Sequence, residues 1–371
     1  MFVRKHDRIS SAHAHAGRGR SLRYMDMMEP IPLSNNNNNN HGLDITGASL
    51  PARSTTREAS EFWRNPLAYR QVAVGIQHVE GQRLLSLHAF DPATLIIDLG
   101  TGDGSLAYDH LLPLIPQGSL IGIDKSQQML DGAARYVNGK PGADRILFMH
   151  GDVTDAGGAW LSKLQRMVQN EQRPVVVFTN AMLHHIYNLD QFRLALRTIR
   201  SLLQEAPSVQ PTRFLASFAG EGNFDLLIEC CDNVRNQTDW GPFFAEWGGY
   251  PLLRPSAERM KFELHEAGFD LSDGKVDLVC VELLLDSYEQ LFRFVRGSMR
   301  SFMGHLQEAI QANGLSPENE KSLLDDFAQQ VTKQYLAQCA RAPSGEILFP
   351  VINLEISIPP AAGFRVVDFT D

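Results

Sequence analysis

The chain has 371 residues, of which 43% are hydrophobic and 21% charged, and its formal net charge is −9. These proportions are typical of a globular protein with a large apolar core, and they exclude a wholly disordered or fibrous chain. An acidic chain repels phosphate backbones, so we expect no nucleic-acid partner. No run of about 18 apolar residues occurs, so we expect no membrane-spanning helix. The four cysteines form no C-x-x-C pair, so we expect no metal site and no disulfide framework.

The first 57 residues predict a disordered tail. They contain few apolar residues and six consecutive asparagines, Asn35 to Asn40, so they bury too little surface to offset the entropy of folding. Several basic residues resemble a mitochondrial presequence, but Asp7 and the lack of an amphipathic pattern argue against one. Together with the scattered cysteines, this favours a cytoplasmic protein, with the mitochondrion as the alternative.

From residue 58 onward, short apolar runs alternate with longer amphipathic segments, which is typical of parallel strands joined by helices. The predicted strands are 94–98, 119–123, 145–150, 175–178, 214–218, 275–283 and 347–358. The predicted helices are 105–114, 127–137, 160–169, 189–203, 256–267, 288–312 and 317–340. Because connections between parallel strands are right-handed, the pattern indicates a doubly wound α/β sandwich.

The last two predicted strands are separated by two long helical stretches. We therefore expect a closing antiparallel hairpin with a helical lid between its arms. The expected organisation is a tail over 1–57 and one domain over 58–371, with lid insertions around 222–255 and 286–343. An aromatic group follows the fifth strand: Trp240, Phe243, Phe244 and Trp247. It either covers an apolar ligand or forms a core-facing stripe, and we favour the stripe.

A glycine-rich segment, Asp98-Leu99-Gly100-Thr101-Gly102-Asp103-Gly104-Ser105, follows the first strand. Glycines there let the backbone turn sharply and approach a ligand, at the edge where open α/β sheets bind ligands. A dinucleotide fingerprint would place its third glycine at Ser105. The carboxylates of Asp98 and Asp103 disfavour a pyrophosphate and favour a cation. The loop therefore suits S-adenosylmethionine (SAM), which carries a sulfonium and an ammonium group.

Polar residues also follow each of the next three strands. Asp124 ends the second strand and can accept bonds from ribose hydroxyls, Asp152 follows the third, and Asn180 follows the fourth. Each alone is an ordinary capping or turn residue, whereas four such elements in order indicate one cofactor site. The predicted cofactor-binding residues are Asp98, Gly100, Thr101, Gly102, Asp124, Lys125, Asp152, Val153, Asn180 and Ala181.

These motifs resemble those of class I SAM-dependent methyltransferases. DLGTGDG is similar to the first motif of that family, GID to the second, GDV to the third and TNAMLHHI to the fourth, over roughly residues 94–186. The resemblance implies a seven-stranded, Rossmann-like methyltransferase sheet with SAM as cofactor. It also implies that Asp152 binds the adenine and that Asn180 and Ala181 lie beneath the methionine moiety.

A narrower resemblance leads to the trans-aconitate and juvenile hormone acid methyltransferases, which methylate carboxylic acids. Trp63-Arg64-Asn65-Pro66 with Tyr69, followed by Gln77, is similar to the N-terminal helix that closes over SAM in that group. The segment RGSMR at 296–300 is similar to an arginine segment of the aconitate branch, although one residue shorter. This resemblance implies that Gln77 faces the active site and that Arg300 binds the substrate.

Methyl transfer displaces a methyl group from a sulfonium, so the protein must hold the acceptor close, aligned and dry. A carboxylate is ionised at neutral pH and needs no base, only donors such as a guanidinium. Arg293 and Arg296 are further candidates beside Arg300. His184, favoured over His185, either positions the acceptor, acts as a base for a phenol or amine, or is a loop residue at the rim.

The predicted function is methyl transfer from SAM to a small molecule, with the carboxylate of an organic acid as the acceptor. The alternatives are methylation of a phenolic or amine natural product, and a SAM-binding protein without catalysis. The predicted catalytic residues are His184, Gln77 and Arg300. The sequence leaves the oligomeric state open.

Overall fold

The computed structural model describes residues 74–205, 212–245, 247–249 and 253–359, without the side chains of residues 74–76, 298, 300 and 301. The predictions for residues 1–57 and for Trp63 to Tyr69 therefore lie outside the described residues. Among the helices described, none combines the length and the apolar character that crossing a bilayer requires.

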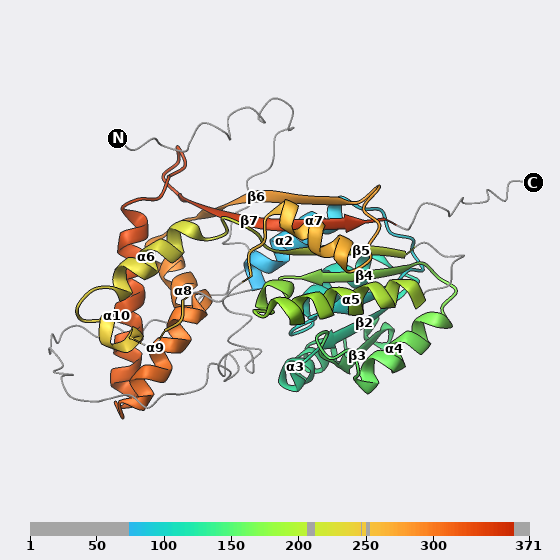
Figure 1. Ribbon diagram of the computed structural model, residues 1–371, viewed down its shortest axis with the longest axis horizontal. Coiled ribbons are helices and arrows are strands. Elements are labelled where there is room, and N and C mark those ends of the chain that lie inside the picture. Colours follow the sequence, from blue (N-terminus) through green and yellow to red (C-terminus); the bar gives the residue numbers. More distant parts are fainter. Residues whose placement is uncertain (1–73, 206–211, 246, 250–252, 360–371) are drawn as a thin grey trace, which may run out of the picture.

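Seven strands form one sheet in the order β3-β2-β1-β4-β5-β7-β6 (Figure 1). The strands are β1 (Leu95–Leu99), β2 (Ser119–Asp124), β3 (Ile146–His150), β4 (Val175–Asn180), β5 (Thr212–Ala219), β6 (Lys275–Leu285) and β7 (Ile347–Ile358). Strands β1 to β5 pair in parallel, and β7 pairs antiparallel to both β5 and β6. The predicted doubly wound, Rossmann-like sheet with a closing hairpin is confirmed.

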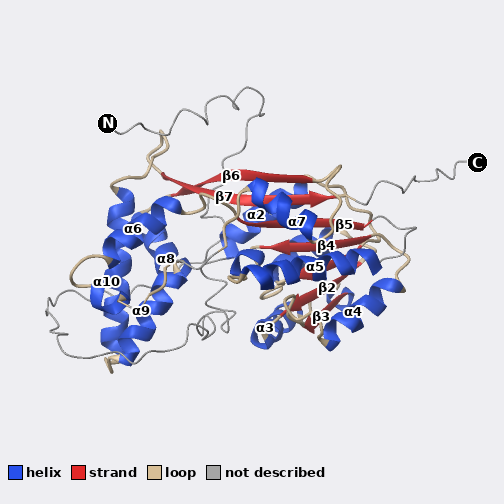
Figure 2. Cartoon of the chain, in the orientation of Figure 1, coloured by secondary structure: helices blue, strands red, loops and turns tan. Residues whose placement is uncertain are grey.

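Helices cover the sheet, and others lie beyond one end of its strands (Figure 2). The long helices are α2 (Val74–Ser86), α3 (Gln127–Val137), α4 (Ala159–Gln169), α5 (Leu189–Glu205), α6 (Asp225–Arg235), α7 (Ala257–Glu266), α8 (Tyr288–Ser298), α9 (Arg300–Ala312) and α10 (Pro317–Leu336). The short ones are η3 (Ala107–Leu111), η4 (Leu112–Leu114), η5 (Ala143–Arg145), η6 (Leu183–His185) and η7 (Gly241–Phe244).

The predicted helical segment over 105–114 is helical, but it is not a regular α-helix. Its first half, η3, is a π-helix, in which the N–H of Leu112 reaches the carbonyl of Ala107, and its second half, η4, is a 3-10 helix. Pro113 has no N–H to continue an α-helical ladder, which accounts for the tighter turn that follows. The predicted helical stretch over 288–312, in which Gly297 and Gly304 predict interruptions, is divided near the first of them, at Met299, into α8 and α9.

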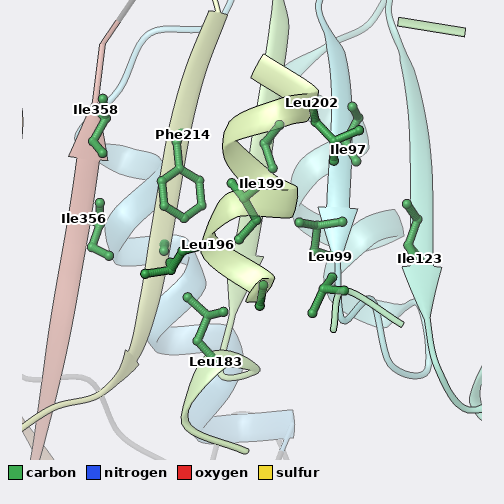
Figure 3. Close-up of a cluster of buried hydrophobic side chains, with 14 of the residues drawn as sticks. Ile97, Leu99, Ile123, Leu183, Leu196, Ile199, Leu202, Phe214, Ile356 and Ile358 are labelled. Atoms are coloured by element: carbon green, nitrogen blue, oxygen red, sulfur yellow. The ribbon is translucent and has the colours of Figure 1, made fainter. Parts of the chain in front are cut away.

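Each face of the sheet has its own apolar cluster. Helices α4, α5 and α7 cover one face, where Leu196, Ile199 and Leu202 of α5 pack towards Leu99 and Phe214 (Figure 3). Their spacing of three residues places them on one side of the helix. Helix α2 and η3 cover the other face, where Leu84 and Leu85 join the second cluster.

Helix α2 is also held to the sheet by polar contacts. Arg83 donates to Glu355 of β7 across 3.0 Å. Glu80, also on α2, is buried, and its burial raises the pKa of the carboxyl to about 7, with Glu355 adding to the effect and Asn353 opposing it. Helix α2 is thus held against the sheet by charged and polar contacts to β7, in addition to the apolar contacts of Leu84 and Leu85.

Helices α6, α8, α9 and α10 form a bundle beyond the carboxyl ends of the parallel strands (Figure 1). The bundle has a core of its own, in which the ring of Phe327 lies 5.2 Å from that of Trp240 and 5.5 Å from that of Phe244. Trp240, Phe243 and Phe244 are all buried there. The favoured interpretation of these aromatic residues as a core-facing stripe is confirmed.

We expect Phe327→Ala to lower the free energy of unfolding by about 3–5 kcal/mol, because Phe327 is fully buried and its removal leaves a cavity. Phe262→Ala is the matched control: this phenylalanine is 50% exposed on α7, so its loss should cost less than about 1 kcal/mol. Urea titration of both variants measures the difference. Equal losses would show that the bundle does not unfold together with the sheet.

Candidate functional site

The loop after β1 is clamped onto β2. The backbone N–H groups of Gly100 and Thr101 both donate to the carbonyl of Ile123, at 2.8 and 2.9 Å. Gly100 has a φ of +77°, a conformation that disfavours any residue with a Cβ. A Cβ at this position would also lie 2.5 Å from Cγ of Met182, in the loop after β4. Glycine at this position therefore lets the loops of β1 and β4 approach each other.

Asp124 joins the glycine-rich loop to the end of β2. One carboxylate oxygen accepts the N–H of Gly102 at 3.0 Å, and the other accepts the N–H of Ser126 at 2.8 Å. Burial raises the pKa of Asp124, while these two hydrogen bonds oppose the increase. Each oxygen retains a further lone pair, so the carboxylate can still accept bonds from a ligand hydroxyl.

Asp98 is buried directly beneath the same loop. Burial raises the pKa of its carboxyl to about 7, and the negative charge of Asp124 adds to the effect. Its Oδ2 has no hydrogen-bond partner among the residues that the structure describes. A buried carboxylate oxygen of this kind favours a cationic ligand, which would supply both the missing bond and the missing charge.

Asn180 connects β4 to α2. Its Nδ2 donates to the backbone carbonyl of Gln77 at 2.9 Å, while its Oδ1 is buried without a partner in the described part of the chain. The next residue, Ala181, has a φ of +53° and donates its N–H to Ser217 at 2.7 Å. Such a conformation is costly for alanine, so the surrounding contacts hold this turn in place.

These loops line a cavity that is partly open to solvent. Five of its lining residues were predicted from the sequence: Gln77, Asp98, Gly100, Thr101 and Asn180. Four others complete the lining: His78, Asp103, Ser105 and Leu106. Asp103 and Ser105 belong to the motif segment itself, so the loop pattern contained the signal for them. His78 is only the neighbour of Gln77, and no spacing in the sequence singles it out.

The other predicted cofactor residues do not line this cavity. Asp152 accepts the N–H and the hydroxyl of Thr154, at 2.9 and 2.7 Å, and so caps the turn after β3. Val153 is buried in the apolar cluster of the sheet. Lys125 is exposed, and its carbonyl accepts a bond from His150 at 2.9 Å.

The three residues predicted to be catalytic are placed differently. Gln77 lines the cavity. His184 lies outside the lining: its Nδ1 accepts the N–H of Ala219 at 3.3 Å, and burial lowers the pKa of the imidazole to about 4. Arg300 begins α9, but its side chain lies outside the described residues. The structure therefore brings Gln77, but not His184, to the cavity.

The two further arginines pair with acidic side chains of the bundle. Arg296 donates to Asp325 at 2.9 Å, and Arg293 donates to Glu289 at 3.1 Å. Within the described residues, no group of three or more histidine, cysteine or acidic side chains is placed to hold a metal ion.

Residues 96–206 match the family model described as a methyltransferase domain. This match runs from β1 to the end of α5 and includes the loops after β1, β2, β3 and β4. Residues 96–206 therefore carry a SAM-dependent methyltransferase domain, with SAM as its cofactor. The unpartnered oxygens of Asp98 and Asn180, and the loop that a Cβ at Gly100 would obstruct, fit a cofactor that carries a cationic amino-acid end.

No curated protein matches the sequence. Among solved structures, the chain is similar to a protein assigned as a sarcosine dimethylglycine methyltransferase from Galdieria sulphuraria, at 12% identity and a TM-score of 0.37, over 75% of this chain and 84% of that one. It is also similar to phosphoethanolamine N-methyltransferase 2 of Haemonchus contortus in complex with SAM, at 13% identity and a TM-score of 0.42, over 82% of this chain and 61% of that one. The chain is also similar to a mycolic acid cyclopropane synthase, at 10% identity and a TM-score of 0.40, over 76% of this chain and 83% of that one.

We expect Gly100→Ala to raise the dissociation constant of SAM at least ~10-fold, because the new Cβ strains the loop and displaces Met182. Gly139→Ala is the matched control. Gly139 has nearly the same φ, +75°, but a Cβ there meets no atom within 4 Å, so we expect the dissociation constant of SAM to be unchanged. Isothermal titration calorimetry measures both constants. An equal change in the two variants would argue against this loop as the cofactor site.

We expect SAM affinity to fall about 10-fold between pH 8 and pH 6, because protonation of Asp98 near pH 7 removes the negative charge that a cation requires. The raised pKa means that the folded chain binds this proton more tightly than the unfolded chain. Ionised Asp98 therefore destabilises the fold as the pH rises from about 4 to about 7, and a bound cation relieves that cost. Titrations across this pH range test the prediction. Asp98→Asn should bind SAM more weakly and with a flatter pH profile, and a profile identical to that of the wild type would contradict it.

Proposed function

We propose that this methyltransferase acts on a small molecule and that the accepting atom is a carboxylate oxygen of an organic acid. The observation that carries the proposal is the state of the histidines near the cofactor site. His184 accepts a backbone N–H and has a pKa of about 4, and His78 makes hydrogen bonds through both ring nitrogens. An acceptor that is already ionised at neutral pH needs neither imidazole as a base.

The surroundings of the cavity support a small acceptor. Helix α2 crosses it on one side, fixed there by the bond between Asn180 and the carbonyl of Gln77. The bundle stands beyond the same edge of the sheet, and its own aromatic side chains fill its interior. We therefore place the acceptor between α2, the loop after β4 and the bundle, with the bundle as a lid that excludes water.

SAM supplies an electrophilic methyl group on its sulfonium. The protein then has to hold the cofactor and align the acceptor. We assign Asp98 to the cationic amino-acid end of the cofactor and Asp124 to its ribose hydroxyls. We assign the amide of Gln77 to the acceptor as a hydrogen-bond donor. We assign the carboxylate of the acceptor to Arg300, the arginine that the resemblance to the aconitate branch implies, because a guanidinium can bind a carboxylate through two parallel hydrogen bonds.

The test uses the full chain, methyl-labelled SAM and a panel of dicarboxylic, tricarboxylic and long-chain acids. Methyl esters hydrolyse in mild base, so label that becomes volatile after this treatment measures ester formation. We expect base-labile label with one class of acid, and less of it with Gly100→Ala at the same SAM concentration. Base-stable label on a phenol or amine would overturn the carboxylate assignment. SAM binding without label transfer to any compound would favour a role without catalysis.

We expect Arg300→Met to lower kcat/KM for the acid at least ~100-fold, because the guanidinium that pairs with the acceptor is lost. The affinity for SAM should remain within about 2-fold of the wild type. Arg293→Met is the matched control on the adjacent helix α8, where Arg293 pairs with Glu289, and it should retain turnover. Steady-state kinetics of the two variants decide the question. Equal activity of the Arg300→Met and Arg293→Met variants would show that Arg300 does not bind the acceptor.

A further inference from the structure

A continuous series of side-chain hydrogen bonds connects the glycine-rich loop to α2. The hydroxyl of Ser105 donates to Asp103 at 2.6 Å, and Nε2 of His78 lies 3.0 Å from the same hydroxyl oxygen. Nδ1 of His78 lies 3.1 Å from Nε2 of His110, and the amide of Gln82 lies 2.9 Å from Nδ1 of His110. The series thus runs from Asp103 in the loop through His78 of α2 and His110 of η3 to Gln82 of α2.

The chemistry of these groups fixes the direction of each bond. Ser105 uses its hydroxyl hydrogen on the carboxylate of Asp103, so its oxygen accepts from His78 and Nε2 of His78 carries a hydrogen. In a neutral imidazole the other nitrogen is then an acceptor, so Nδ1 of His78 receives the N–H of His110. Nδ1 of His110 is then the acceptor for the amide of Gln82, whose nitrogen lies 2.9 Å from Nδ1 and 3.0 Å from Nε2 of this ring. Every donor in the series meets an acceptor, and the series ends on a carboxylate that lines the cavity.

This series links two walls of the cavity that come from different parts of the chain. Asp103 and Ser105 belong to the loop after β1, whereas His78 belongs to α2, and all three line the cavity. The N–H of Ser105 also donates to Asp103 at 3.0 Å. The orientation of the Asp103 carboxylate therefore depends on Ser105, and the hydroxyl of Ser105 depends on the position of α2.

We propose that His78 is a positioning residue for cofactor binding: through Ser105 it orients Asp103 and holds α2 at the cavity, so that the position of α2 and the binding of SAM are coupled. His78 acts on SAM through Ser105 and Asp103, and α2 is retained on the site by the same bond. The inference uses the SAM site but not the nature of the acceptor, so it stands or fails separately from the proposed carboxylate chemistry.

The first experiment is a double-mutant cycle on the dissociation constant of SAM. We expect His78→Phe and Ser105→Ala each to weaken SAM binding about 10-fold. The double variant should be no weaker than the weaker single variant, because both changes remove the same bond. His265→Phe, at an exposed position on α7, and Ser201→Ala, on α5, are the matched controls and should bind SAM as the wild type does. Losses that multiply in the double variant would overturn the proposal, as would wild-type affinity in both single variants.

The second experiment compares two conservative variants that remain polar and uncharged. The amide nitrogen of glutamine can occupy the place of Nε2, whereas asparagine reaches only as far as Nδ1. We therefore expect His78→Gln to retain SAM affinity within about 3-fold and His78→Asn to lose about 10-fold. If any polar residue sufficed at this position, the two variants would bind SAM with equal affinity. Equal affinities would therefore overturn the proposal.

Hydrogen exchange of the α2 amides supplies an independent readout. In the wild type, we expect SAM to slow exchange across residues 77–86. In Ser105→Ala, saturating SAM should leave these amides exchanging nearly as fast as in the free protein, while those of α3 remain unchanged. Full protection of α2 by SAM in this variant would show that the helix closes without His78, and would overturn the coupling.

Discussion

The cofactor site depends on one costly arrangement, a carboxylate buried at the end of a central strand. Asp98 lies beneath the glycine-rich loop with Oδ2 unpartnered among the described residues, and its burial raises the pKa to about 7. Asp124 lies close enough to add to this effect. A protein tolerates two such acids where a ligand restores charge and hydrogen bonds. The tight loop at Gly100, the strained turn at Ala181 and the overlying α2 all surround the place that such a ligand would occupy.

The parallel strands were predictable because each contains a short apolar run. Runs such as Leu95 to Ile97 and Val175 to Phe178 are buried on both faces of the sheet, as a central parallel strand requires. The segment after the glycine-rich loop was harder, since its apolar spacing suits an α-helix while Pro113 prevents a regular one. The bundle was predictable as helices but not as one packed body, because the contacts of α6 with α10 join segments far apart in the sequence.

The parts of the candidate site that lie in short sequence motifs after the strands were predictable. The loops at Asp98, Gly100 and Asn180 were identified from their positions after strands, and they meet in one cavity. His78 was not identifiable, because its role depends on Ser105 and His110, which reach it only through the tertiary fold. His184 illustrates the opposite case. Its position after the fourth strand suggests a catalytic role, whereas its imidazole accepts a bond from the backbone of Ala219, a contact that no sequence pattern reveals.

The position of α2 also bears on when the enzyme becomes competent during synthesis. This helix precedes every strand in the sequence, yet it packs against β4 and β5 and pairs Arg83 with Glu355 of β7, 272 residues later. Such distant contacts form late, because the intervening chain must first be made and ordered. A nascent chain would therefore bring together the loops after β1 to β4 well before α2 settles over them. Tight retention of the cofactor would begin only after the last strand has joined the sheet.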